Sequence, residues 1–179
     1  MRKIIACICT ALFLSGAAFA QDSVIPQRLE LVQVGEDDDE VSLEVFNMPK
    51  DGQNQYYLSV GHLGIGDEVL QINFDPLFEL FIPLGNTLDE AMQKLELLKE
   101  TCKADAGTTI EMDGCLALGV PNENLETVTV TSRRFLFSKL LAFSVERDGW
   151  IRASHVSRSS LNSIVASLKL YRKIHPNEE

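Results

Sequence analysis

The chain has 179 residues, of which 45% are hydrophobic and 23% are charged. This composition is typical of a folded globular domain and excludes a disordered or fibrous chain. The formal net charge of −10 makes nucleic acid and anionic membrane surfaces poor partners for the molecule as a whole.

The first 20 residues have the pattern of a secretory signal peptide. A basic start at Arg2 and Lys3 precedes an apolar run over 4–14, and the cleavage signal Ala18-Phe19-Ala20 follows. We therefore expect export to the periplasm or exterior of a bacterium and one mature domain over 21–179. Cys7 lies in a context similar to the lipidation signal of bacterial lipoproteins, but the apolar run that should precede it is missing, so lipidation is the less favoured alternative.

Charge is distributed unevenly along the mature chain. Residues 21–124 hold 21 acidic and 5 basic residues, a net charge of −16, whereas 125–179 hold 5 acidic and 9 basic residues, a net charge of +4. This asymmetry could draw the two halves, or two molecules, together. Two solvated surfaces without a special role are the simpler interpretation, because exposed ion pairs contribute little. No later segment is apolar for about 18 residues, so the sequence predicts no membrane span in the mature chain.

The first half of the mature chain predicts strands followed by a helix. Apolar residues alternate over 41–45, after an acidic turn at 36–40, which predicts a hairpin with the segment 29–34. Further strands are expected at 55–63, 68–74 and 77–84, the last two joined by a turn at Asp75-Pro76. Thr87 and Glu90 then form a capping box, and an apolar stripe follows from Leu88 to Cys102.

Two cysteines, Cys102 and Cys115, remain after signal removal. An even number in an oxidising compartment predicts a disulfide that would join the helix end to the segment beyond a turn at Asp113-Gly114. Such a bridge would stabilise the fold by about 3 kcal/mol. Free thiols are the alternative, and a zinc site lacks the further ligands it needs, because only His62 lies between Pro49 and Cys115.

The second half predicts strands over 127–131, 134–147 and 150–156, with a hairpin turn at Asp148-Gly149. A final helix is expected from Ser160 to Ile174. The distance along the sequence from the hairpin turn to the helix cap is the same in both halves. The segments 68–100 and 141–173 are therefore candidates for a duplicated hairpin-plus-helix unit. With or without duplication, the prediction is an α+β fold, a mostly antiparallel sheet covered by two amphipathic helices.

No catalytic constellation emerges from the sequence. The mature chain lacks the serine-hydrolase and zinc-protease motifs, and its neighbours Ser154 and His155 should point to opposite faces of a strand. Glu79 lies in an apolar run, where a catalytic role is conceivable. The simpler interpretation is that Glu79 points outward from a strand that is buried on its other face. We expect no cofactor and no metal, and an enzyme is the less favoured class.

A basic and aromatic patch is the candidate site. Trp150, the only tryptophan, lies near Arg147, Arg152 and Arg158, although it could instead cap the core. The leading hypothesis is a non-catalytic exported binding domain whose partner is another envelope or secreted protein. A carrier of a lipid or other apolar ligand between sheet and helices is the alternative, and a hydrolase is the third. The sequence leaves the partner and the oligomeric state open.

Overall fold

The computed structural model describes residues 25–33, 41–61, 63–65, 74–75 and 78–175. The predicted signal peptide with Cys7, the acidic turn at 36–40 and all but the last residue of the expected strand 68–74 lie outside the described residues. Predictions that fall on those segments stay predictions.

The described part of the chain contains one antiparallel sheet and two helices, which confirms the α+β class. The sheet has ten strands in the order β1-β2-β3-β6-β7-β8-β9-β10-β4-β5. The strands are β1 (Gln27–Gln33), β2 (Val41–Asn47), β3 (Asn54–Val60), β4 (Leu63–Ile65), β5 (Phe74–Asp75), β6 (Glu79–Gly85), β7 (Thr109–Ala117), β8 (Glu126–Phe135), β9 (Ser138–Arg147) and β10 (Trp150–Ser157). The helices are α1 (Leu88–Lys103) and α2 (Arg158–Ile174), and neither is long and apolar enough to cross a membrane.

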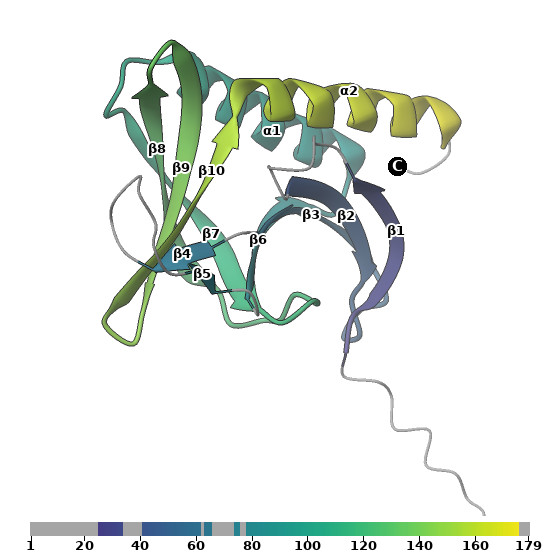
Figure 1. Ribbon diagram of the computed structural model, residues 1–179. Coiled ribbons are helices and arrows are strands. Elements are labelled where there is room, and N and C mark those ends of the chain that lie inside the picture. The colour runs from purple at the N-terminus through teal and green to yellow at the C-terminus, as the bar shows by residue number, and fades with distance from the viewer. Residues whose placement is uncertain (1–24, 34–40, 62, 66–73, 76–77, 176–179) are drawn as a thin grey trace, which may run out of the picture.

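The sheet is strongly curled, and the two helices lie side by side at its upper end in the view of Figure 1. They run antiparallel, because Arg172 near the end of α2 pairs with Asp89 near the start of α1 at 2.7 Å. Their apolar stripes join one hydrophobic core with seven of the longer strands. The helix residues in that core are Leu88, Ala91, Leu95, Leu98, Cys102, Leu161, Ile164, Val165, Leu168 and Tyr171.

The strand pairing expected for the two candidate duplicated units is found only in the second unit. β9 and β10 form the expected hairpin, but β5 pairs with β4, and β6 pairs with β3 and β7. The side chains of 80–84 in β6 are all buried, because Leu80, Ile82 and Leu84 join the large core on one face and Phe81 packs in a second cluster on the other. Each helix follows the last strand of a run of four neighbouring strands, β1-β2-β3-β6 before α1 and β7-β8-β9-β10 before α2.

Of the two Asp-Gly pairs expected to form turns at 113–114 and 148–149, only the second does. Asp148 and Gly149 have φ values of 57° and 74° and join β9 to β10 as predicted. Asp113 and Gly114 lie inside β7, so the predicted turn there is wrong. Gly114 serves close packing instead, because a Cβ atom at this position would lie 2.5 Å from Cγ2 of Val128.

Both helices begin at a hydroxyl cap. The capping box at the start of α1 is confirmed, since Thr87 Oγ1 accepts from Glu90 N and the Glu90 carboxylate accepts from Thr87 N, each at 3.2 Å. The start expected for α2 at Ser160 is two residues late, because the helix begins at Arg158. Ser157 is the cap, and its hydroxyl accepts a hydrogen bond from Ser160 N at 3.1 Å.

The predicted disulfide between Cys102 and Cys115 is not formed, and both thiols are free and buried. Cys102 lies in the core shared by helices and sheet. Cys115 lies in a second, smaller cluster with Phe46, Tyr57 and Phe81. Successive strand residues point to opposite faces, so Leu116 joins the first cluster and Cys115 the second. The β7 backbone therefore separates the two thiols.

Candidate binding surfaces

The structure brings together three of the four residues of the predicted patch. Trp150 opens β10 and is paired in the sheet with Arg147, and Arg152 follows two residues later. Trp150 is 62% exposed, so it does not cap the core. Arg158 lies beyond the other end of this eight-residue strand, about 26 Å away at the rise of an extended chain. The patch as predicted, with all four residues, is therefore not formed.

Arg147 is held by a network that joins the ends of three strands. Its Nε and Nη2 atoms donate to the Glu126 carboxylate at 2.7 Å and 2.9 Å. Its Nη1 atom donates to the carbonyl of Leu116 at 3.1 Å. A bidentate ion pair of this kind is directional and strong for a surface pair. Arg147 therefore acts as a rigid support and presents little free charge to a partner.

Three large exposed apolar residues lie close in the sequence or in the sheet to the members of this network. Leu118, Leu125 and Trp150 are 60%, 52% and 62% exposed. Leu118 lies two residues beyond Leu116, Leu125 precedes Glu126, and Trp150 is paired with Arg147, so the Arg147 network places all three at one end of the sheet. We call Leu118, Leu125, Glu126, Arg147 and Trp150 the Trp150 surface. Leu118 and Leu125 were not among the site residues predicted from the sequence. Their only distinguishing feature there is that a large apolar residue flanks each end of the loop from Gly119 to Asn124.

Arg152 packs against its own chain. Its guanidinium carbon lies 5.7 Å from the ring centroid of Phe78, within the range of a cation–π contact. Its Nη1 atom also lies 3.4 Å from the carbonyl oxygen of Arg147. Arg152 therefore stabilises the edge of the Trp150 surface from within the fold.

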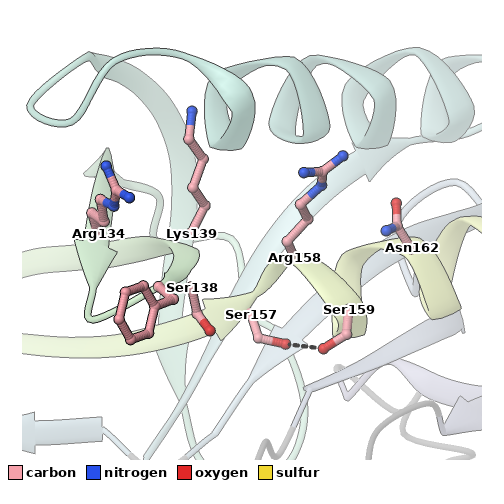
Figure 2. A pocket seen from close by; sticks show the side chains of 8 residues that line it. Arg134, Ser138, Lys139, Ser157, Arg158, Ser159 and Asn162 are labelled. Carbon is pink, nitrogen blue, oxygen red and sulfur yellow. Dashed lines mark hydrogen bonds between the residues drawn. The ribbon is translucent and has the colours of Figure 1, made fainter.

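A second candidate site lies at the opposite end of β8, β9 and β10. A hollow of about 560 Å³ lies between the β8–β9 turn and the start of α2, and Figure 2 shows the side chains that line it. Eight residues line this basic hollow: Arg134, Phe137, Ser138, Lys139, Ser157, Arg158, Ser159 and Asn162. Three of these are cationic and none is acidic, although the whole chain carries a net charge of −10.

The three cations of the basic hollow differ in their partners. Lys139 donates to the carbonyls of Lys103 and Ala104 at the end of α1, where a positive charge favours the helix dipole. Within the described part of the chain, Arg134 and Arg158 have no carboxylate at ion-pair distance. Figure 2 shows Arg134, Lys139 and Arg158 extending in the same general direction. The hollow therefore presents two guanidinium groups that the fold does not neutralise.

A buried thiol lies near the basic hollow. Burial raises the pKa of Cys102, and the nearby charges of Arg158 and Lys139 partly oppose that rise in pKa. The thiol therefore stays protonated and poorly reactive at neutral pH.

The turn beside the hollow exposes three consecutive apolar residues, which we call the hairpin tip. Phe135, Leu136 and Phe137 are 51%, 75% and 95% exposed. Leu136 has a φ of 53°, in the left-handed region that is unfavourable for a leucine. Sequence analysis expected a strand that continued from 134 to 147, because the tip contains none of the usual turn residues. The basic residues at 133, 134 and 139, on both sides of the apolar triplet, were the only indication in the sequence that this segment is exposed.

The remaining reactive groups are dispersed. The Ser154 hydroxyl donates to the carbonyl of Gly61 at 2.8 Å, and the Glu79 carboxylate accepts from the Ser59 hydroxyl at 2.9 Å. His175 stacks on Tyr171 with ring centroids 4.3 Å apart, and His62 lies outside the described residues. Among the residues with described positions, no group of three or more His, Cys, Asp or Glu could hold a metal ion.

One carboxylate is buried outside both surfaces. Glu44 in β2 accepts from the Ser42 hydroxyl at 2.7 Å and lies 2.8 Å from Nη2 of Arg28. Burial raises the pKa of Glu44, the charge of Glu79 adds to the rise, and Ser42 and Arg28 oppose it. Arg28 also lies over the Phe46 ring at 5.5 Å, so the group ties the edge strand β1 to the sheet.

The geometry therefore offers two exposed surfaces at opposite ends of three strands. No protein-family model, curated protein or solved structure matches this chain.

Proposed function

We propose that this protein is an exported, non-catalytic binding domain that engages another envelope or secreted protein through the Trp150 surface. The observation that carries the proposal is the exposure of Trp150, Leu118 and Leu125 at the end of the sheet where Arg147 and Glu126 form a fixed pair. Tryptophan and arginine are the residues that most often dominate the free energy of protein binding. A rigid apolar centre with its charges already paired loses little entropy and little hydration when a partner covers it.

The chemistry of the Trp150 surface indicates the kind of partner. Because Arg147 and Glu126 neutralise each other, the attraction would come from burial of apolar area, with little dependence on salt. A stable complex buries about 800 Å² on each partner, so the Trp150 surface would be the centre of a wider contact. We infer a partner with an apolar groove wide enough for an indole ring.

The alternative of apolar-ligand carriage has less support. We propose that the two helices cover the concave face of the sheet and are retained for that structural role. A carrier would need open space between helices and strands, where Leu95, Leu98, Leu161, Ile164 and Leu168 are fully or almost fully buried in the core. Packed side chains leave no room for a ligand without rearrangement.

The test is affinity capture from an envelope fraction with three forms of the protein. Wild type and the control Leu170→Ser, which changes an exposed apolar residue of α2, should capture the same protein. Trp150→Ser should bind that protein with roughly 30-fold lower affinity, the loss typical of a binding hot spot. Its melting temperature should stay close to that of wild type, because the side chain is exposed. Equal capture by Trp150→Ser and wild type would contradict the proposal, as would a large loss of stability.

A further inference from the structure

The hairpin tip exposes apolar side chains that contribute little to the fold. Phe137 is almost completely exposed and Leu136 is three-quarters exposed, at a turn that stands at the top of the view in Figure 1. A leucine in the left-handed region is strained, and asparagine or glycine would form this turn more easily. The three apolar residues therefore call for an explanation outside the fold, and burial against another apolar phase is the simplest one.

Basic side chains lie directly behind the tip. The segment 132–140 contains Arg133, Arg134 and Lys139 and no acidic residue. Arg158 adds a fourth cation from the start of α2, across the basic hollow from Arg134. Within the described part of the chain Arg134 and Arg158 lack carboxylate partners, whereas Arg28, Arg147 and Arg172 each have one. The cations are thus available to anions that meet the tip.

The shape of this region suits a lipid surface better than a protein groove. The tip is a two-residue turn between β8 and β9, and a projecting turn contributes less toward the roughly 800 Å² that a stable protein interface buries on each side than the joined ends of three strands at the Trp150 surface do. A bilayer accepts a small apolar wedge at any point, and arginine side chains can extend from the wedge to the phosphate layer. A basic cluster next to an anionic leaflet gains further attraction.

We propose that the hairpin tip and the basic hollow dock this protein on an anionic lipid surface. Leu136 and Phe137 enter the interface of the bilayer, and Arg134 and Arg158 bind lipid phosphate groups. Lys139 keeps its bonds to the end of α1 and adds only its charge. The attraction is local to this end of the sheet, because neither the segment 132–140 nor the lining of the basic hollow contains an acidic residue.

This inference does not depend on the proposed protein partner, because the two surfaces lie at opposite ends of β10. Lipid docking can therefore fail while partner capture succeeds, and the reverse also holds.

The test is sedimentation with vesicles of phosphatidylcholine containing 30% phosphatidylglycerol, compared with vesicles of phosphatidylcholine alone. Wild type should bind the anionic vesicles, bind the neutral ones at least tenfold more weakly, and be released by salt. Phe137→Ser should weaken binding roughly tenfold, as expected for one apolar side chain withheld from the interface. Arg134→Gln and Arg158→Gln should each weaken it about fivefold.

Two control variants make the same types of substitution at positions away from the hairpin tip and the basic hollow. Leu97→Ser alters an exposed apolar residue of α1, and Lys173→Gln removes a charge at the far end of α2 from Arg158. Both should bind the anionic vesicles as wild type does. The proposal is overturned if wild type does not sediment, if it binds neutral vesicles equally, or if Phe137→Ser binds as tightly as Lys173→Gln. If wild type does not bind vesicles but captures a protein partner that Phe137→Ser does not capture, the proposal is also overturned and the tip is a protein-binding site.

Discussion

Leu136 and Glu44 are two residues whose positions oppose folding. Leu136 adopts a backbone conformation that disfavours a leucine, and Glu44 holds a carboxylate away from water. Glu44 is partly compensated by Ser42 and Arg28, which also tie β1 to the sheet. Leu136 has little compensation within the fold, because three-quarters of its side chain is exposed. Strain without a structural benefit is a reason to look for function at that position.

Leu136→Asn should therefore stabilise the protein. Asparagine tolerates the left-handed region, and the substitution removes few packing contacts. We expect a gain of about 1 kcal/mol, which for a chain of this size raises the melting temperature by about 2 to 4 °C. Thermal unfolding followed by circular dichroism measures the change. A fall in melting temperature would show that Leu136 does contribute to the fold.

Glu44→Gln should change the dependence of stability on pH. Because the pKa of Glu44 is raised in the folded state, the folded protein binds its proton more tightly than the unfolded chain does. Folding then becomes less favourable as pH rises from the ordinary value near 4.5 through the folded pKa. Glutamine removes this titration, so the free energy of unfolding of the variant minus that of wild type should increase between pH 4.5 and 7. Urea unfolding at several pH values tests this, and a flat or decreasing difference would contradict it.

At the scale of elements, turns and helix caps could be predicted from the sequence where contacts between residues distant in sequence do not change the local conformation. The capping box of α1 and the Asp148-Gly149 turn were predictable, because each is decided by residues close in sequence. The same Asp-Gly signal failed at Gly114, where contacts with the distant residues Val128 and Ile82 determine the backbone. The hairpin tip was missed because its turn contains Leu136 and Phe137 in place of turn formers. Of the candidate site, Trp150 was identifiable by residue type, whereas Leu118 and Leu125 depended on strand register.

Gly114→Ala should destabilise β7 by about 1 to 3 kcal/mol, the usual cost of overpacking. The added methyl group would meet Val128 Cγ2 at 2.5 Å and Ile82 Cδ1 at 3.0 Å. Val128→Ala makes room for it, so the double variant should lose less stability than the two single losses added together. Urea unfolding of the four proteins completes the cycle. Simple additivity would show that Gly114 is needed for a reason other than this contact.

At the scale of the whole molecule, the two candidate surfaces lie at opposite ends of β8, β9 and β10, whereas the charge asymmetry lies between the two halves of the sequence. The acidic excess lies in the first half, and two ion pairs between the helices, Asp89 with Arg172 and Glu96 with Lys169, connect it to the basic second half. These pairs are exposed and contribute little stability, so the shared core holds the halves together. Long strands β8, β9 and β10 separate the Trp150 surface from the basic hollow. One domain can thus hold a lipid surface at one end and a protein at the other.

Fluorescence quenching of Trp150 tests this arrangement most directly, since it is the only tryptophan of the chain. Acrylamide quenching would be compared for the free protein and the protein bound to vesicles containing 30% phosphatidylglycerol. The account predicts equal quenching and an unchanged emission maximum, because the indole ring remains in water while the opposite end is docked. Loss of quenching with a blue shift on vesicle binding would place Trp150 at the lipid surface and contradict the separation of the two surfaces.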